Sequence, residues 1–265
     1  HSDDFIISNY KNKKKLDFFI KNIDLATFEF ENIPFQTLDY VEKKITVSPK
    51  PSIIRILQDR LKEKNFLNSI GIKTTEFYYL KKVNKRKINN SFFPAFVKTT
   101  RFGYDGKGQI FFKDKKNFLK YFFKNNEYII EKLVNFKKEI SIAISKNKTK
   151  SVSYDAFENL HKNQILQKSH IPANISAKLN NQAKEIAKKI ANKLNYIGTM
   201  CVEFFVTKKN ELLVNEIAPR VHNSGHLTMN AHNVSQFDNH IRAVCNLKLK
   251  KPKRVHKAIM YNILG

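Results

Sequence analysis

Two glutamates in successive apolar segments are the first residues whose chemistry needs an explanation. Glu203 lies within Met-Cys-Val-Glu-Phe-Phe-Val, and Glu216 lies within Leu-Leu-Val-Asn-Glu-Ile. An unpaired carboxylate buried among such neighbours costs several kcal/mol, so each needs a cation or a strong partner. With the amide of Asn215, two carboxylates on adjacent strands suit Mg²⁺ held between phosphate groups. The alternative, that both face solvent, is permitted by strand alternation in about half of such cases, but the pair favours the metal site.

A lysine followed by a glycine-rich stretch forms a second candidate group. Lys98 ends an expected strand, and three of the seven glycines of the chain lie in residues 103–109. Glycine lets backbone N–H groups approach phosphate oxygens, and a lysine neutralises their charge. This pattern predicts a phosphate-covering hairpin. The spacing matches neither a P-loop nor G-x-G-x-x-G, and an ordinary hairpin turn is the alternative.

A loop rich in hydrogen-bond donors follows the second glutamate strand. Arg220, His222, Asn223 and Ser224 lie close together within residues 215–226. Donors packed this closely suit a small anion, and we favour that role over a purely structural one.

Two further glutamates, Glu131 and Glu139, lie in or next to expected strands. A strand edge with a free backbone carbonyl and N–H, flanked by carboxylates, suits an adenine and a ribose. Because exposed strand glutamates are common, this pattern is not specific by itself.

Short strands and a few helices must position these residues. Strands are predicted over 25–30, 92–98, 109–112, 128–134, 138–145, 200–206, 211–217 and 257–264. Helices are predicted from Ser52, as N-cap, to Gly71, near 118–123, over 179–194 and over 232–243. Residues 149–171 are polar and show little periodicity. The order predicts an α+β protein with antiparallel strands.

Composition limits the class of protein. The 265 residues are 42% hydrophobic and 12% aromatic, which supports a sizeable core and argues against a disordered or collagen-like chain. No apolar run reaches the ~20 residues of a membrane-spanning helix, and no secretory signal is visible. Cys201 and Cys245 lack the spacing of a disulfide framework or a metal site. A cytoplasmic protein without membrane contact is expected.

The net charge of +26 suggests polyanionic partners. However, only seven of the 49 basic residues are arginine, and the lysines are scattered along the chain. A nucleic-acid interface more often clusters its charge and uses arginine, so we expect nucleic acid not to be a partner.

Together these motifs resemble the ATP-grasp superfamily. They comprise a lysine strand, a glycine-rich hairpin, glutamate-bearing strands and a terminal Glu…Asn-Glu pair. Longer strings are similar to the N5-carboxyaminoimidazole ribonucleotide synthetase family of purine biosynthesis. These strings are residues 27–34, 58–64, 103–109, 158–161, 215–226 and 235–237.

The resemblance implies an ATP-dependent carbon–nitrogen ligase. MgATP would phosphorylate bicarbonate to carboxyphosphate, and the amine of 5-aminoimidazole ribonucleotide would capture the carboxyl group. ATP and Mg²⁺ are thus the implied cofactors, 5-aminoimidazole ribonucleotide and bicarbonate the substrates, and a homodimer the assembly.

The resemblance also implies roles residue by residue. It assigns ATP contacts to Arg60, Lys98, Gly103, Tyr104, Asp105, Gly106, Lys107, Gly108, Gln109, Glu131, Lys132, Leu133, Val134, Glu139, His161, Asn215 and Glu216. It assigns Mg²⁺ to Glu203 and Glu216. It assigns bicarbonate and its phosphorylated form to Arg220, His222 and Asn223, as catalytic residues. It assigns the ribonucleotide to Glu31, Tyr104 and Asp105.

The implied domains are the end of an N-terminal pre-ATP-grasp domain (1–50), an ATP-grasp domain (51–250) and the start of a C-terminal domain (251–265). A small lid subdomain is expected at about 75–135. Family members begin with a nucleotide-fold strand and glycine-rich turn and end with a further domain. Because this chain has neither in full, we expect ATP binding to survive and turnover to be poor.

Rival interpretations remain open at this stage. Another ATP-grasp enzyme, such as the formate-dependent glycinamide ribonucleotide transformylase or biotin carboxylase, is one, although the string 222–226 argues against both. A degenerate, non-catalytic ATP-grasp protein is a second, which the presence of Lys98, Glu203, Asn215 and Glu216 argues against. A basic nucleic-acid-binding module without catalysis is a third, and it predicts steeply salt-dependent binding.

Overall fold

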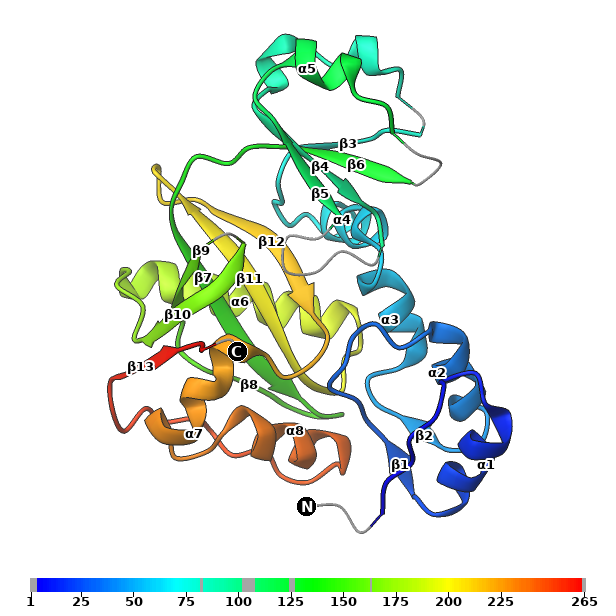
Figure 1. Ribbon diagram of the computed structural model, residues 1–265. Coiled ribbons are helices and arrows are strands. Elements are labelled where there is room, and N and C mark those ends of the chain that lie inside the picture. The colour runs from blue at the N-terminus through cyan, green and yellow to red at the C-terminus, as the bar shows by residue number, and fades with distance from the viewer. Residues whose placement is uncertain (1–3, 82, 102–107, 124–126, 163, 264–265) are drawn as a thin grey trace.

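The computed structural model describes residues 4–81, 83–101, 108–123, 127–162 and 164–263. Strands in these residues form a two-stranded, a four-stranded and a seven-stranded sheet. In Figure 1 the four-stranded sheet (the small sheet) lies at the top, the seven-stranded sheet (the large sheet) at the centre, and the N-terminal elements at the lower right. The mixture of helices and largely antiparallel strands confirms the predicted α+β class.

The N-terminal segment forms two helices beside a parallel strand pair, where the sequence predicts only a strand over 25–30. Helix α1 (Lys13–Lys21) is capped by the side chain of Asn12. Strand β1 (Leu25–Ala26) pairs with β2 (Thr46–Val47), and α2 (Phe35–Glu42) connects them. The predicted strand is therefore too long, because its pairing with β2 ends at Ala26.

The helix predicted from Ser52 to Gly71 is two helices, α3 (Pro51–Leu57) and α4 (Arg60–Ser69). The carboxylate of Asp59 accepts the N–H groups of the two residues that follow Arg60, at 3.1 and 3.2 Å, and so begins a new helix. Ser52 is not the N-cap of α3, since Pro51 already occupies its first turn. Gly71 ends α4 at φ +65°, as predicted.

The small sheet has the strand order β3-β6-β4-β5. Its strands are β3 (Phe77–Tyr79), β4 (Ala95–Thr99), β5 (Gln109–Phe112) and β6 (Tyr128–Lys132), and its helical turns are η1 (Lys85–Lys87), η2 (Asn90–Phe92) and α5 (Lys115–Lys120). A core of phenylalanines including Phe92, Phe112 and Phe118 packs these turns on the sheet. The strand predicted over 109–112 is confirmed, the one predicted over 92–98 begins only at Ala95 because residues up to Phe92 form η2, and the one predicted over 128–134 ends at Lys132. The helix predicted near 118–123 lies earlier because Asp114 caps it.

The large sheet has the order β12-β11-β7-β9-β10-β13, with β8 pairing β7. Its strands are β7 (Phe136–Lys146), β8 (Ser151–Ser153), β9 (Phe157–Lys162), β10 (Ile165–Ile171), β11 (Gly198–Thr207), β12 (Leu212–Ala218) and β13 (Ala258–Tyr261). Three of these strands lie in 149–171, where the sequence shows no periodicity. The strand alternation of apolar and polar residues is hidden because polar residues such as Asn159 and Ser169 are buried there and form hydrogen bonds with each other.

Alternation along β11 gives the large sheet two different faces. Met200, Val202 and Phe204 belong to the main apolar core, which they share with helix α6 (Ala177–Lys193). Glu203, the next residue along from Val202, therefore points to the opposite face. We call this opposite face, which carries Cys201 and Glu203, the site face.

The remaining helices lie after β12. They are η3 (Asn223–Leu227), α7 (Thr228–Ala231) and α8 (Gln236–Val244). Figure 1 shows α7 and α8 together below the large sheet, while α6 lies behind its strands. The helix predicted over 232–243 begins later because Ser235 caps α8, and the predicted helix over 179–194 is confirmed as α6.

Among the described residues, no helix combines the length and the apolar character needed to cross a membrane.

Candidate active site

An irregular pairing between β11 and β12 brings the two predicted metal ligands together. Val202 lies opposite Ile217, and Phe204 lies opposite Val214. One residue of β11, Glu203, therefore faces two residues of β12, namely 215 and 216. A bulge of this kind turns side chains out of the regular ladder and is common beside active sites. It places both Asn215 and Glu216 next to Glu203, as the predicted magnesium site requires.

The two carboxylates differ in environment. Glu203 is only 9% exposed, whereas Glu216 is exposed. Burial, reinforced by the charge of Glu216, raises the pKa of Glu203 to about 8. The two carboxylates therefore repel each other when both are ionised, and a bound cation would offset this repulsion.

His222 lies against Glu203, with 3.3 Å between its Nε2 and a carboxylate oxygen. Its other nitrogen, Nδ1, lies 2.8 Å from the hydroxyl of Ser224. Burial, with a further contribution from the charge of Arg220, lowers the pKa of His222 to about 3. The imidazole is therefore neutral at physiological pH.

The side chain of Gln236 fixes the backbone of His222. Its amide donates to the carbonyl of His222 at 2.7 Å, and its carbonyl accepts the His222 N–H at 3.0 Å. Gly225 is needed beside this clamp, because a Cβ there would lie 2.4 Å from the Gln236 carbonyl oxygen. The motif strings 215–226 and 235–237 thus form one structural unit.

Arg220 connects the same loop to the N-terminal segment. Its Nε donates to the carboxylate of Glu31 at 3.0 Å, and its Nη1 donates to the carbonyl of Val221. Burial raises the pKa of Glu31 in spite of the charge of Arg220. Two residues predicted to contact different substrates are therefore in direct contact.

Glu139 and His161 lie on the adjacent strands β7 and β9. His161 Nδ1 is 2.9 Å from the Glu139 carboxylate. Burial opposes protonation, but the hydrogen bond to Glu139 and the charge of Glu203 outweigh it and raise the pKa of His161. These residues therefore belong to the same electrostatic environment as the predicted metal ligands.

Lys98 shares a buried counter-ion with a second lysine. Glu131 lies 3.2 Å from Lys98 Nζ and 3.4 Å from Lys64 Nζ, and it accepts the hydroxyl of Thr75 at 2.8 Å. Burial opposes its ionisation, but the charges of Lys64 and Lys98 outweigh burial and lower the pKa of Glu131 to about 2. Glu131 is therefore a buried ionic residue, and not an exposed strand glutamate.

Glu63, which precedes Lys64 in the chain, holds the backbone of β12 beside Glu216. Its carboxylate accepts the N–H of Ile217 at 2.6 Å, next to Glu216. Burial and the charge of Glu216 raise the pKa of Glu63 to about 8. The sequence analysis missed both Glu63 and Lys64, although they lie in the motif string 58–64. The sequence signal that could have revealed them is that two adjacent residues of opposite charge lie on the same helix as the buried Leu67.

The other predicted contacts are distributed around these groups. Arg60 donates to the carbonyls of Thr99 and Thr100, beside Lys98. Lys132 and Leu133 use their N–H groups within the small sheet, donating to the carbonyls of Glu76 and Pro94, and Val134 lies between β6 and β7. Asn223 begins η3.

Part of the predicted phosphate hairpin can be located. Gly108 has φ +76°, and its carbonyl accepts the N–H of Thr99 at 2.8 Å, so β4 and β5 are joined as a hairpin. Gln109 pairs with Lys98 across the strands, and its side chain bonds to Gln164. The remaining predicted residues of the hairpin lie outside the described part of the chain: Gly103, Tyr104, Asp105, Gly106 and Lys107.

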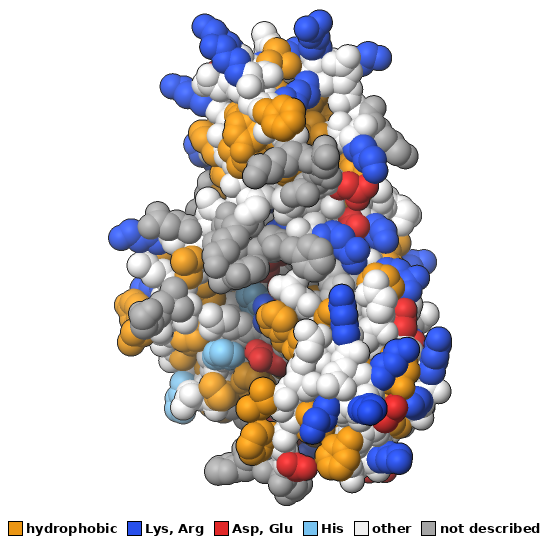
Figure 2. Space-filling model, turned by 45° about the vertical axis from the view of Figure 1, so that its right-hand side comes forward, with side chains coloured by type: hydrophobic (Ala, Val, Ile, Leu, Met, Phe, Trp, Pro, Cys, Tyr) orange, Lys and Arg blue, Asp and Glu red, His pale blue; other side chains and the backbone are white. Residues whose placement is uncertain are grey.

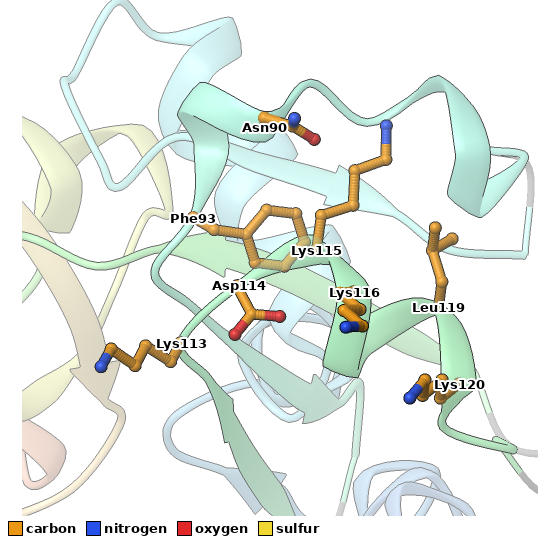
Figure 3. Close-up of a pocket in the computed structure, with 8 residues that line it drawn as sticks. All are labelled: Asn90, Phe93, Lys113, Asp114, Lys115, Lys116, Leu119 and Lys120. Carbon is orange, nitrogen blue, oxygen red and sulfur yellow. The ribbon is translucent and has the colours of Figure 1, made fainter.

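A hollow of about 760 Å³ on the small sheet is separate from the site. Figure 3 shows the residues that line it, which include four lysines: Asn90, Phe93, Lys113, Asp114, Lys115, Lys116, Leu119 and Lys120. No predicted site residue is among them. Figure 2 shows Lys and Arg side chains spread over the visible face, from the small sheet to the N-terminal helices, with hydrophobic and uncharged surface between them.

Among the described residues, no three or more His, Cys, Asp or Glu side chains are arranged to hold a metal ion by themselves. A cation at Glu203 and Glu216 would therefore draw on the amide of Asn215 and on oxygens of a bound ligand. Oxygen donors of this type suit Mg²⁺, which usually takes one or two protein carboxylates plus phosphate oxygens.

Comparisons with known protein families identify two adjoining domains. The ATP-grasp domain family matches residues 65–237, and the ribonucleotide synthetase preATP-grasp domain family matches residues 1–58.

Comparisons with individual proteins agree with each other. N5-carboxyaminoimidazole ribonucleotide synthase of Staphylococcus aureus (strain COL) is 39% identical over 268 residues, which cover 99% of this chain and 71% of that protein. The crystal structure of the Staphylococcus aureus N5-carboxyaminoimidazole synthetase complexed with ADP matches with a TM-score of 0.92 and 37% identity, over 99% of this chain and 72% of that one. The Aspergillus clavatus synthase in complex with ADP and 5-aminoimidazole ribonucleotide matches with a TM-score of 0.91 and 26% identity, over 100% of this chain and 71% of that one.

Proposed function

This chain belongs to the N5-carboxyaminoimidazole ribonucleotide synthase family, and from that premise we propose that it carboxylates 5-aminoimidazole ribonucleotide with bicarbonate, converting MgATP to ADP and phosphate. It is an ATP-grasp enzyme, an ATP-dependent carbon–nitrogen ligase of purine biosynthesis. The observation that carries the proposal is the bulge that sets Asn215 and Glu216 against Glu203, with His222 in contact with the same carboxylate.

The donor set fits Mg²⁺. Burial, together with repulsion by Glu216 on the neighbouring strand, raises the pKa of Glu203 to about 8. A divalent cation relieves this repulsion and favours the ionised form of both groups. We assign Glu203 and Glu216 as its ligands, with Asn215 beside them. When bound, the ion would neutralise charge on the phosphates of ATP.

ATP contacts follow the small sheet and its junction with the large sheet. Lys98 is held by Glu131 where it can neutralise a phosphate, and Arg60 lies beside the end of the same strand. The hairpin 103–109 would cover the phosphates and exclude water, which would otherwise hydrolyse the carboxyphosphate. We assign the segment 131–134 to the adenine, through backbone groups other than the N–H groups of Lys132 and Leu133, which already donate to the carbonyls of Glu76 and Pro94. Glu139 with His161 would take a more polar part of the nucleotide.

Bicarbonate and its phosphorylated form would bind at Arg220, His222 and Asn223. Arg220 supplies a fixed positive charge, and neutral His222 supplies a hydrogen bond without a competing positive charge. A bicarbonate oxygen attacks the terminal phosphorus of ATP, and ADP leaves.

The ribonucleotide amine then attacks the carboxyl carbon of carboxyphosphate, so that a C–N bond forms, the C–O bond to phosphate breaks, and the amine loses a proton. We assign Glu31, whose carboxylate accepts a hydrogen bond from Arg220, to the ribonucleotide. Tyr104 and Asp105, which lie outside the described residues, are assigned to the same substrate.

The domain limits at residues 50 and 250 and the homodimer stay predictions from the resemblance, and the cytoplasmic location stays a prediction from composition. Absence of nucleic acid among the partners also stays a prediction.

The test is release of ADP by the protein in the presence of MgATP, with 5-aminoimidazole ribonucleotide and bicarbonate omitted in turn. We expect release to require both substrates and formate not to replace bicarbonate. Release with formate would favour the transformylase alternative, and release independent of the ribonucleotide would contradict the proposal. His222→Ala is expected to retain ATP binding by calorimetry and to lose bicarbonate-dependent release.

A further inference from the structure

A row of buried polar side chains runs across three strands of the large sheet toward the site. Ser169 on β10 donates to the carbonyl of the Asn159 side chain on β9 at 2.8 Å. The amide nitrogen of Asn159 donates to the hydroxyl of Ser141 on β7 at 2.9 Å. Ser141 is in turn 2.8 Å from the hydroxyl of Ser224 in η3. We call these four residues the polar row.

The polar row ends on the active-site imidazole. The Ser224 hydroxyl lies 2.8 Å from Nδ1 of His222, and the opposite nitrogen, Nε2, lies 3.3 Å from Glu203. A continuous path of hydrogen bonds therefore leads from the interior of the sheet to His222, whose Nε2 lies beside the predicted metal ligand Glu203.

Water cannot replace any of these partners. Ser141, Ser169 and Ser224 are fully buried, and Asn159 is 7% exposed. Burying a hydroxyl or amide group costs free energy unless the group has a hydrogen-bond partner. Each member must therefore satisfy its neighbour, and the donors and acceptors have to be arranged consistently along the row.

This requirement gives the row a direction. An amide nitrogen can only donate, so the Ser141 hydroxyl accepts from Asn159 and turns its single proton toward Ser224. The Ser224 oxygen accepts that proton and turns its own toward Nδ1 of His222, which at 2.8 Å is a closer and stronger acceptor than the thiol sulfur of Cys201 at 4.0 Å. Nδ1 of His222 is then an acceptor, which leaves the ring proton on Nε2.

We propose that the polar row fixes His222 as the tautomer with its proton on Nε2, and that Asn159 and Ser141 are positioning residues for this enzyme. With this tautomer the imidazole presents only a donor to the site. Its single Nε2–H can donate to an oxygen of Glu203 or to an anion beside it, but Nε2 cannot accept a proton. The consequence for turnover rests on the proposed function, whereas the position of the proton does not.

The first test is the tautomer itself, read from the ¹⁵N shifts and long-range ¹H–¹⁵N couplings of histidine-labelled protein without substrates. The chain has eight histidines, and the His222 signals are those lost in His222→Gln. We expect the wild-type ring to be protonated on Nε2. Protonation on Nδ1 would overturn the proposal, and this measurement needs no variant that perturbs the row.

The second test removes the groups that set the direction of hydrogen-bond donation along the polar row. In Ser141→Ala the Ser224 hydroxyl is free to accept from Nδ1 as well as to donate to it, so the His222 signals should move toward a mixture of both tautomers. Asn159→Ala should do the same. Ser145→Ala is the matched control: it lies on the same strand, is equally buried and bonds to a hydroxyl, that of Thr199, at 2.7 Å, but it is outside the row.

Turnover provides the third readout. Loss of an outer hydrogen-bond partner of a metal-ligating histidine typically costs about 10- to 100-fold in activity, and we take the same range for His222. We expect Ser141→Ala to lose turnover in this range with an unchanged KM for ATP, and Ser145→Ala to match the wild type. An unchanged tautomer in Ser141→Ala overturns the proposal. A mixed tautomer with wild-type turnover overturns the positioning role, and absence of turnover in the wild type counts against the proposed function alone.

Discussion

The fully buried carboxylate of Glu131, shared by two lysines, allows a quantitative test of how the phosphate-binding lysine is held. Glu131→Gln keeps the shape of the side chain but removes its negative charge. Lys64, which is 1% exposed, and Lys98 would then lack their shared counter-ion. We expect a large loss of stability from this single substitution.

The magnitude follows from the pKa. The lysines lower the pKa of Glu131 from 4.5 to about 2. At 1.36 kcal/mol for each pH unit, this corresponds to about 3 kcal/mol of stability at neutral pH. Breaking a buried ion pair by removal of one partner costs about 3–5 kcal/mol, which agrees. Because the folded pKa is depressed, this stability is present above about pH 4.5 and is lost as the pH falls toward about 2.

The assay is thermal unfolding at pH 7 in parallel with a control pair. Glu211→Gln breaks a pair with Lys73 of similar length, 3.1 Å, in which the side chains are 71% and 49% exposed. We expect this control to cost less than about 1 kcal/mol. A loss of 3 kcal/mol in a chain of this size lowers Tm by roughly 6–12 °C.

A double-mutant cycle refines the test. Lys64→Met alone should also destabilise, because it leaves the buried carboxylate of Glu131 with Lys98 alone in place of two lysines. In Glu131→Gln/Lys64→Met the surplus buried charge is removed, so the combined loss should be smaller than the sum of the single losses by about 2 kcal/mol. Additive losses, or a loss in Glu131→Gln no larger than in Glu211→Gln, would refute the reasoning.

Three further predictions concern the site itself. Glu216→Gln should abolish Mg²⁺-dependent ADP release with little change in Tm, since the side chain is exposed; wild-type release would disprove its role at the metal. Lys98→Ala should weaken ATP binding at least about 10-fold by calorimetry, as expected for loss of a charge-assisted contact of about 1.5–3 kcal/mol, and unchanged affinity would contradict its assignment to a phosphate. Gly225→Ala should displace Gln236 from the backbone of His222, lower turnover and cost about 1–3 kcal/mol of stability; an enzyme as active and stable as the wild type would show that the clamp is not needed.

The residues that sequence analysis located best are those whose chemistry conflicts with their surroundings. Glu203 was found because a carboxylate in an apolar strand needs a partner, and the structure places Asn215 and Glu216 opposite it. Lys98 was found because it precedes a glycine-rich turn. Helix α6 was found because apolar residues repeat at helical spacing from Leu179 to Leu194.

Features that depend on tertiary contacts escaped the sequence analysis. The break between α3 and α4 results from capping by Asp59, while Gln58 is held by two carbonyls of the N-terminal segment. Strands β8 to β10 were missed because hydrogen bonds between chain-distant residues satisfy their buried polar side chains. Lys64 was missed because a lysine on a helix normally faces solvent, and only the position of Glu131 explains its burial.

The central claim, that bicarbonate is phosphorylated before it is transferred, is tested most directly with ¹⁸O-labelled bicarbonate. The enzyme is incubated with MgATP, 5-aminoimidazole ribonucleotide and the labelled bicarbonate, and the phosphate released is analysed by mass spectrometry. The account predicts that the phosphate carries an oxygen atom from bicarbonate, because the bridging oxygen of carboxyphosphate stays with phosphorus when the amine attacks carbon. Unlabelled phosphate formed along with the carboxylated product would contradict it.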